Sequence, residues 1–134
     1  MKSTVILVGG LLLISMAVWA QDDAQYQTWM KSNNADAASL RKDLMAKSGD
    51  AAAADAKKLQ ATLTEVQAYW QKKNFSDATQ FATDAVNGFK EVGDLAAAGK
   101  FDEASAALMK AQANCGGCHM AHREKAADGS WKIK

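Results

Sequence analysis

Residues 101–122 read FDEASAALMKAQANCGGCHMAH and carry a clear helical pattern. Positions suited to a protein core recur there every three or four residues, namely Phe101, Ala104, Leu108, Ala111, Cys115, Cys118 and His122. This spacing matches the period of an α-helix, so these side chains share one face. The sequence therefore predicts a helix whose inward-facing stripe includes both cysteines of the chain.

Three earlier stretches repeat this spacing, and the chain contains no proline. Their seam positions are Tyr26, Met30, Asn33, Ala37, Leu40 and Leu44 in the first, Ala52, Ala56, Leu59, Leu63, Val66 and Trp70 in the second, and Ala78, Ala82, Ala85, Phe89 and Val92 in the third. Gly49 and Gly99 are predicted to end the first and third helices. Because short connections favour antiparallel neighbours, we predict an all-α, antiparallel up-down-up-down four-helix bundle. Residues from about 128 show no strong periodic pattern and are predicted to form a short loose tail.

The N-terminus has the features of an export signal. Met1-Lys2 supplies a positive charge, residues 5–18 are almost wholly apolar, and a small residue, Ala20, precedes Gln21. We therefore predict a signal peptide at residues 1–20, a single mature domain at residues 21–134 and a periplasmic location. Once cleaved, such a chain is not an integral membrane protein, and an uncleaved anchor is the open alternative.

The charge balance argues against nucleic acid as a partner. Of the 16 Lys and Arg side chains only Lys2 precedes Gln21, so the mature chain has 15 basic and 15 acidic side chains. Proteins that bind nucleic acid usually carry a clear excess of positive charge.

Cys115-Gly116-Gly117-Cys118-His119 is the C-x-x-C-H pattern of covalent haem attachment. Thiols one helical turn apart can add to the two vinyl groups of one porphyrin, and the adjacent imidazole is then held under the iron. We therefore predict one haem c, attached through Cys115 and Cys118, with His119 as an axial iron ligand. The two glycines inside a helix suggest that the backbone comes close to the macrocycle.

Two other interpretations of the motif stay open. A redox dithiol would use the same cysteines, but it would need a strand-helix-strand context. A zinc site would take Cys115, Cys118, His119 and His122 as ligands, all from about two helical turns.

In this motif and its position the chain resembles the class II cytochromes c, the family of cytochrome c prime and its low-spin relatives. Those proteins are four-helix bundles with the pattern C-x-x-C-H-x-x-x-R or K near the C-terminus, which Arg123 completes here in register. The resemblance covers residues 21 to about 127. Two positions depart from it, since His122 stands where the family usually has an aromatic residue and Tyr26 where it commonly has arginine.

The resemblance implies an electron-transfer protein rather than an enzyme, with redox proteins as its partners. The alternative within the family is a five-coordinate haem protein that binds small gases such as NO or CO. Because the family often dimerises through its first two helices, a homodimer is a further expectation.

Met30 separates these two functions, because it lies on the inward seam of the first helix, which faces the distal side of the haem in this family. A thioether there would be the sixth iron ligand and would raise the reduction potential. The alternative is ordinary core filling beneath an open iron site.

Four further residues are candidates for the haem pocket. Tyr26 could hydrogen-bond a propionate and Trp29 could form a pocket wall. His122 could lie at the haem edge, and Arg123 could compensate a propionate. For each of them the alternative is a side chain that packs or is solvated elsewhere.

Overall fold

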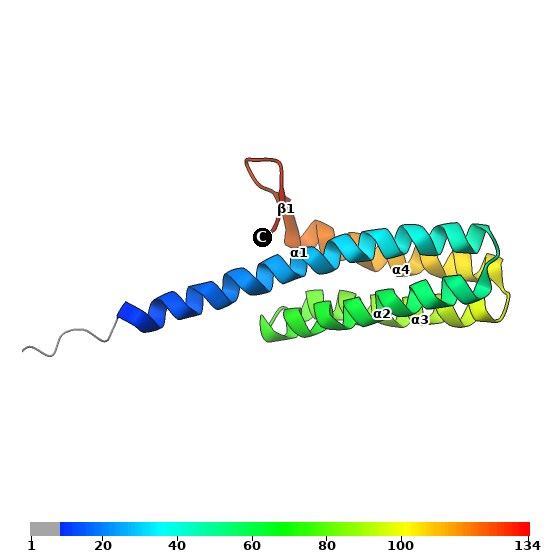
Figure 1. Ribbon diagram of the computed structural model, residues 1–134, viewed down its shortest axis with the longest axis horizontal. Coiled ribbons are helices and arrows are strands. Elements are labelled where there is room, and N and C mark those ends of the chain that lie inside the picture. The colour runs from blue at the N-terminus through cyan, green and yellow to red at the C-terminus, as the bar shows by residue number, and fades with distance from the viewer. Residues whose placement is uncertain (1–8) are drawn as a thin grey trace, which may run out of the picture.

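The computed structural model describes the backbone of residues 9–134 and the side chains from Asp22 onward. This part of the chain forms four helices and a small hairpin (Figure 1), namely α1 (Gly9–Met45), α2 (Gly49–Lys72), α3 (Ser76–Ala97), α4 (Phe101–His122), β1 (Arg123–Lys125) and β2 (Trp131–Ile133). The predicted bundle of four helices is therefore confirmed.

The predicted signal peptide, residues 1–20, lies outside the residues whose side chains are described. Within the described part of the chain, no helix combines the length and apolarity needed to cross a membrane.

The three turns between helices share one hydrogen-bond pattern. After each helix one residue takes a left-handed backbone conformation, and these residues are Lys47 (φ 54°), Asn74 (φ 61°) and Gly99 (φ 73°). The next amide donates a hydrogen bond to the carbonyl five residues earlier, as from Ser48 to Asp43 at 2.9 Å. This pattern satisfies the last carbonyls of each helix, and Gly99 ends α3 as predicted.

The prediction for Gly49 is wrong, because Lys47 takes the left-handed position and Gly49 begins α2. A Cβ atom at Gly49 would lie 2.7 Å from the carbonyl oxygen of Ala96. Glycine therefore serves here to let the start of α2 approach the end of α3.

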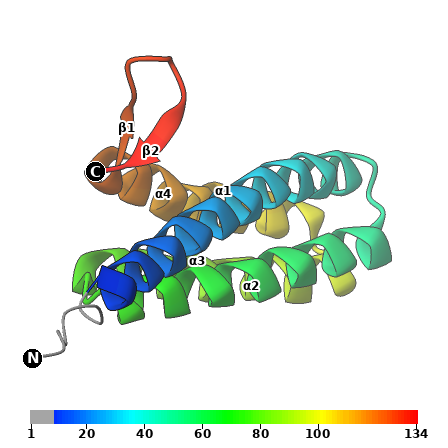
Figure 2. The same cartoon turned by 60° about the vertical axis from the view of Figure 1, so that its left-hand side comes forward.

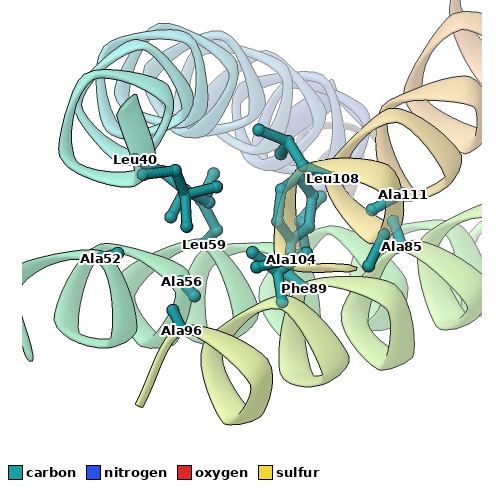
Figure 3. Close-up of a cluster of buried hydrophobic side chains, with 14 residues drawn as sticks. Leu40, Ala52, Ala56, Leu59, Ala85, Phe89, Ala96, Ala104, Leu108 and Ala111 are labelled. Carbon is teal, nitrogen blue, oxygen red and sulfur yellow. The ribbon is translucent and has the colours of Figure 1, made fainter. Parts of the chain in front are cut away.

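The helices pack mainly in sequence order, α1 on α2, α2 on α3 and α3 on α4, whereas α1 and α4 touch sparsely. Figure 2 shows the hairpin standing off the end of α4. The larger core cluster joins large side chains with small ones, and its labelled members in Figure 3 include Leu40, Leu59, Phe89, Leu108 and several alanines. The small side chains let the helices approach closely.

A second core cluster lies around Trp70, near the turn between α2 and α3. Tyr26 brings α1 into this cluster, with its ring centroid 4.6 Å from that of Tyr69. The hydroxyl of Tyr69 in turn donates a hydrogen bond of 2.6 Å to Asp23. Because Leu40 and Leu44 lie in the larger cluster and Tyr26 lies in the second, α1 is attached to the bundle at two separate places.

The tail predicted to be loose forms a hairpin instead. Arg123 pairs with Ile133 across β1 and β2. The turn is held by Asp128, whose carboxylate accepts hydrogen bonds from the amide and hydroxyl of Ser130 at 2.9 and 2.6 Å. Lys134 closes the end of α4, because its amide donates to the carbonyl of His122 at 3.1 Å. Each strand has only three residues, too few for a periodic pattern to reveal.

Candidate functional site

A cavity of about 250 Å³ lies between the helices, with the C-terminal half of α4 as one wall. Several seam residues that were predicted to face inward are only half-buried, and they line this cavity: Met30, Asn33, Ala37, Cys115 and Cys118. The part of the wall that comes from α2 and α3 is apolar, with Leu59, Leu63, Val66, Phe81, Ala82, Ala85 and Phe89.

The two cysteines line this cavity as free thiols. Burial raises the pKa of Cys115, and burial together with the neighbouring Cys115 raises the pKa of Cys118 to about 11. Both thiols are therefore protonated at neutral pH. A reactive dithiol needs the opposite environment, one that stabilises a thiolate.

His119 lines the same cavity. Burial lowers the pKa of His119, and the charge of Arg123 lowers it further. The imidazole is therefore neutral near pH 7, which is the form that binds a metal. In the described part of the chain no three His, Cys, Asp or Glu side chains come together as a metal site. That leaves the zinc interpretation without a ligand set.

Met30 and Asn33 supply the α1 wall of the cavity. The Nδ2 and Oδ1 atoms of Asn33 are buried and have no hydrogen-bond partner among the described residues. Buried polar atoms without partners are rare in folded proteins and call for an explanation. A polar group bound in this cavity would supply such a partner. The same cavity presents the thiols of Cys115 and Cys118 and the imidazole of His119, the groups that covalent attachment of a porphyrin requires.

A second cavity, of about 660 Å³, continues outward between α1, the end of α4 and the hairpin. It shares Tyr26, Met30, Asn34, Cys118 and His119 with the inner cavity. The two cavities therefore lie next to each other at the C-x-x-C-H motif. Ligand sites in proteins usually have volumes of about 300–1,000 Å³.

The predicted pocket residues divide into two groups. Tyr26 is buried and lines both cavities, and burial raises its pKa, so its hydroxyl stays protonated. Arg123 lines the outer cavity, with its guanidinium carbon 3.9 Å from the centre of the Trp131 ring. Trp29 lines neither cavity and packs at the edge of the second core cluster.

His122 is largely engaged elsewhere. Its Nε2 lies 2.8 Å from Oδ2 of Asp77, and its ring centroid is 5.0 Å from that of Trp70 and 5.4 Å from that of Phe75. It reaches only the outer cavity. These contacts match the alternative of a packed, hydrogen-bonded histidine.

Sequence analysis missed several lining residues, among them Asn34, Phe81, Gln112 and Asn114. Asn34 could have been found, since it lies one turn after Met30 on the same face. Phe81 also explains one glycine of the motif, because a Cβ atom at Gly117 would lie 2.7 Å from its ring. At Gly116 a Cβ atom would meet open space.

The chain matches no protein-family model, no curated protein and no solved structure. The function of the chain has therefore to be inferred from the site itself.

Proposed function

We propose that this chain is an exported, periplasmic c-type cytochrome, an up-down-up-down four-helix bundle that holds one covalent haem and carries electrons. The observation that carries the proposal is that Cys115, Cys118, His119 and Met30 all line one hollow. The spacing of the first three is the attachment pattern for haem c.

In this proposal Cys115 and Cys118 would hold the haem through thioether bonds, because each S–H would add across one vinyl double bond of the porphyrin and leave no free thiol. His119 would hold the iron through its neutral imidazole and Met30 through its thioether. When bound, the haem supplies one-electron exchange between ferric and ferrous iron. No substrate is transformed, and the partners are other redox proteins.

The remaining cavity residues adjust the surroundings of the haem. The apolar wall from α2 and α3, including Leu63 and Phe89, excludes water and lowers the local polarity. The side-chain amide of Asn33 lines the cavity and could form hydrogen bonds with the bound haem. Tyr26 lines both the inner and the outer cavity.

The same apolar wall favours a second candidate function. A small gas such as CO or NO could occupy the cavity beside Leu59, Phe81 and Phe89 if Met30 does not bind the iron. The chain would then be a gas-binding cytochrome rather than a carrier.

The test is expression together with the bacterial haem-maturation machinery, followed by intact mass and absorption spectra. We expect the mass of residues 21–134 plus one haem, retained after extraction with acid and organic solvent. The variant Cys115→Ala/Cys118→Ala is the matched control and should lose the haem. A wild-type mass equal to that of the bare polypeptide would rule the proposal out. A low-spin spectrum with a methionine-to-iron charge-transfer band favours the carrier, and a high-spin spectrum favours the gas binder.

A further inference from the structure

The outer cavity has a distinct charge pattern. Three cationic side chains line it, Lys31 from α1, Arg123 from β1 and Lys132 from β2. Among the described residues, no Asp or Glu side chain does so. The chain as a whole is nearly neutral, so this local excess of positive charge is a property of the fold.

The guanidinium of Arg123 is fixed in place and keeps a hydrogen-bond donor without a partner among the described residues. Its guanidinium carbon lies 3.9 Å from the centre of the Trp131 ring, and its Nε atom is buried without a hydrogen-bond partner among the described residues. A guanidinium fixed on an aromatic face loses little freedom when it binds a planar carboxylate with two hydrogen bonds.

The C-terminal hairpin completes this site. Its second strand is anchored on one side by Gln27, whose Nε2 lies 3.4 Å from the carbonyl oxygen of Trp131. On the other side the amide of Lys134 donates to the carbonyl of His122. Lys132 is paired with Glu124 at 3.1 Å, but Glu124 does not line the cavity.

We propose that the outer cavity, closed by the C-terminal hairpin, is a carboxylate-binding site in which Arg123 is the main ligand and Lys31 and Lys132 assist. Two sources could supply the carboxylate, the propionates of a bound haem or a small free dicarboxylate. The first source rests on the proposed function, and the second does not.

The haem arm of the test uses holoprotein with carbon-13 in the propionate carboxyl groups, in a diamagnetic ferrous form. A pH titration followed by NMR should show a carboxyl group whose pKa rises by about 1 unit or more in Arg123→Gln, because the nearby cation is gone. Lys132→Gln should also raise the pKa of this carboxyl group, while the contact of Arg123 with Trp131 stays in place. The control is Lys125→Gln, which removes a positive charge from β1, the strand of Arg123. Lys125 does not line the cavity, so this change should leave the carboxyl pKa unchanged.

The second arm titrates wild-type protein with succinate and follows the Arg123 Nε–H and Trp131 indole signals. Saturable shifts that Arg123→Gln abolishes, with propionates that titrate alike in every variant, would assign the site to a free dicarboxylate. If the hairpin unfolds in Arg123→Gln, the cross-strand contacts to Ile133 will be lost. The results for Lys132→Gln are then used in place of those for Arg123→Gln.

Propionates that titrate alike in all variants, together with no saturable succinate binding, would overturn the inference. A protein without covalent haem by mass would instead defeat the proposed function, and the succinate arm would still test the carboxylate site.

Discussion

Gly88 on α3 lies close to Ala111 on α4, near the motif. A Cβ atom there would lie 2.8 Å from Cβ and 3.2 Å from Cα of Ala111. Ala111 is one helical turn before Cys115, so a shift of α4 at this point would move the stripe that carries Cys115 and Cys118. We therefore expect the added methyl group of Gly88→Ala to clash with Ala111 and to displace α4.

The magnitude follows from two opposing effects. Alanine in place of glycine inside a helix normally stabilises by about 1 kcal/mol. Overpacking a closely packed interface costs about 1–3 kcal/mol, and the backbone of Ala111 cannot swing aside. The net expectation for Gly88→Ala is a free energy of unfolding between unchanged and about 2 kcal/mol lower.

The assay is urea unfolding of the holoprotein, followed by far-UV circular dichroism. Asn87→Ala, at the exposed neighbouring position, is the matched control and should change stability by less than about 0.5 kcal/mol. Ala111→Gly should rescue Gly88→Ala in the double variant, so that the two changes are not additive. A Gly88→Ala protein about 1 kcal/mol more stable than wild type would refute the close approach, because an unhindered helical glycine behaves that way.

Three further substitutions test single contacts. Tyr69→Phe removes the hydrogen bond to Asp23 and should lower the free energy of unfolding by about 1.5 kcal/mol, measured by urea denaturation. The hydrogen bond from His122 holds the pKa of Asp77 below its ordinary value of 3.8, so this pair should stabilise fully above that pH. The contribution is lost as the pH falls through the lowered pKa, and Asp77→Asn should remove that part of the acid dependence in unfolding experiments. If the chain holds haem as proposed, Met30→Ala should shift the iron toward high spin, speed CO binding and lower the reduction potential, whereas an unchanged visible spectrum would show that Met30 is not a ligand.

The helices could be predicted from sequence because burial follows a simple period. Leu40, Leu59, Phe89 and Leu108 were expected to face inward, and all four are buried. The hairpin could not be predicted, since its strands are short and their pairing depends on the turn at Asp128 and on contacts with α4.

The motif residues of the site could be predicted, but their surroundings could not. Cys115, Cys118 and His119 follow from a short local pattern, and the structure places them along one cavity. His122 shares their helix, yet its partner Asp77 is 45 residues away in sequence. Periodicity tells which way a side chain points, but it does not tell which residue of another helix lies opposite.

The position of the hollow has a physical cause in α1. This helix is fixed near its middle by Tyr26, packed on the second core cluster, and near its C-terminal end by Leu40, fully buried in the first. Between them the inward positions are Met30, Asn33 and Ala37, one flexible, one polar and one small side chain. Asn33 and Ala37 are smaller than the leucine or phenylalanine of a packed core, and the amide of Asn33 leaves two buried polar atoms without hydrogen-bond partners among the described residues. This segment of α1 lines the same cavity as Cys115 and Cys118, and it is poorly packed and poorly hydrogen-bonded there. Such a segment is expected where a cofactor supplies the missing contacts.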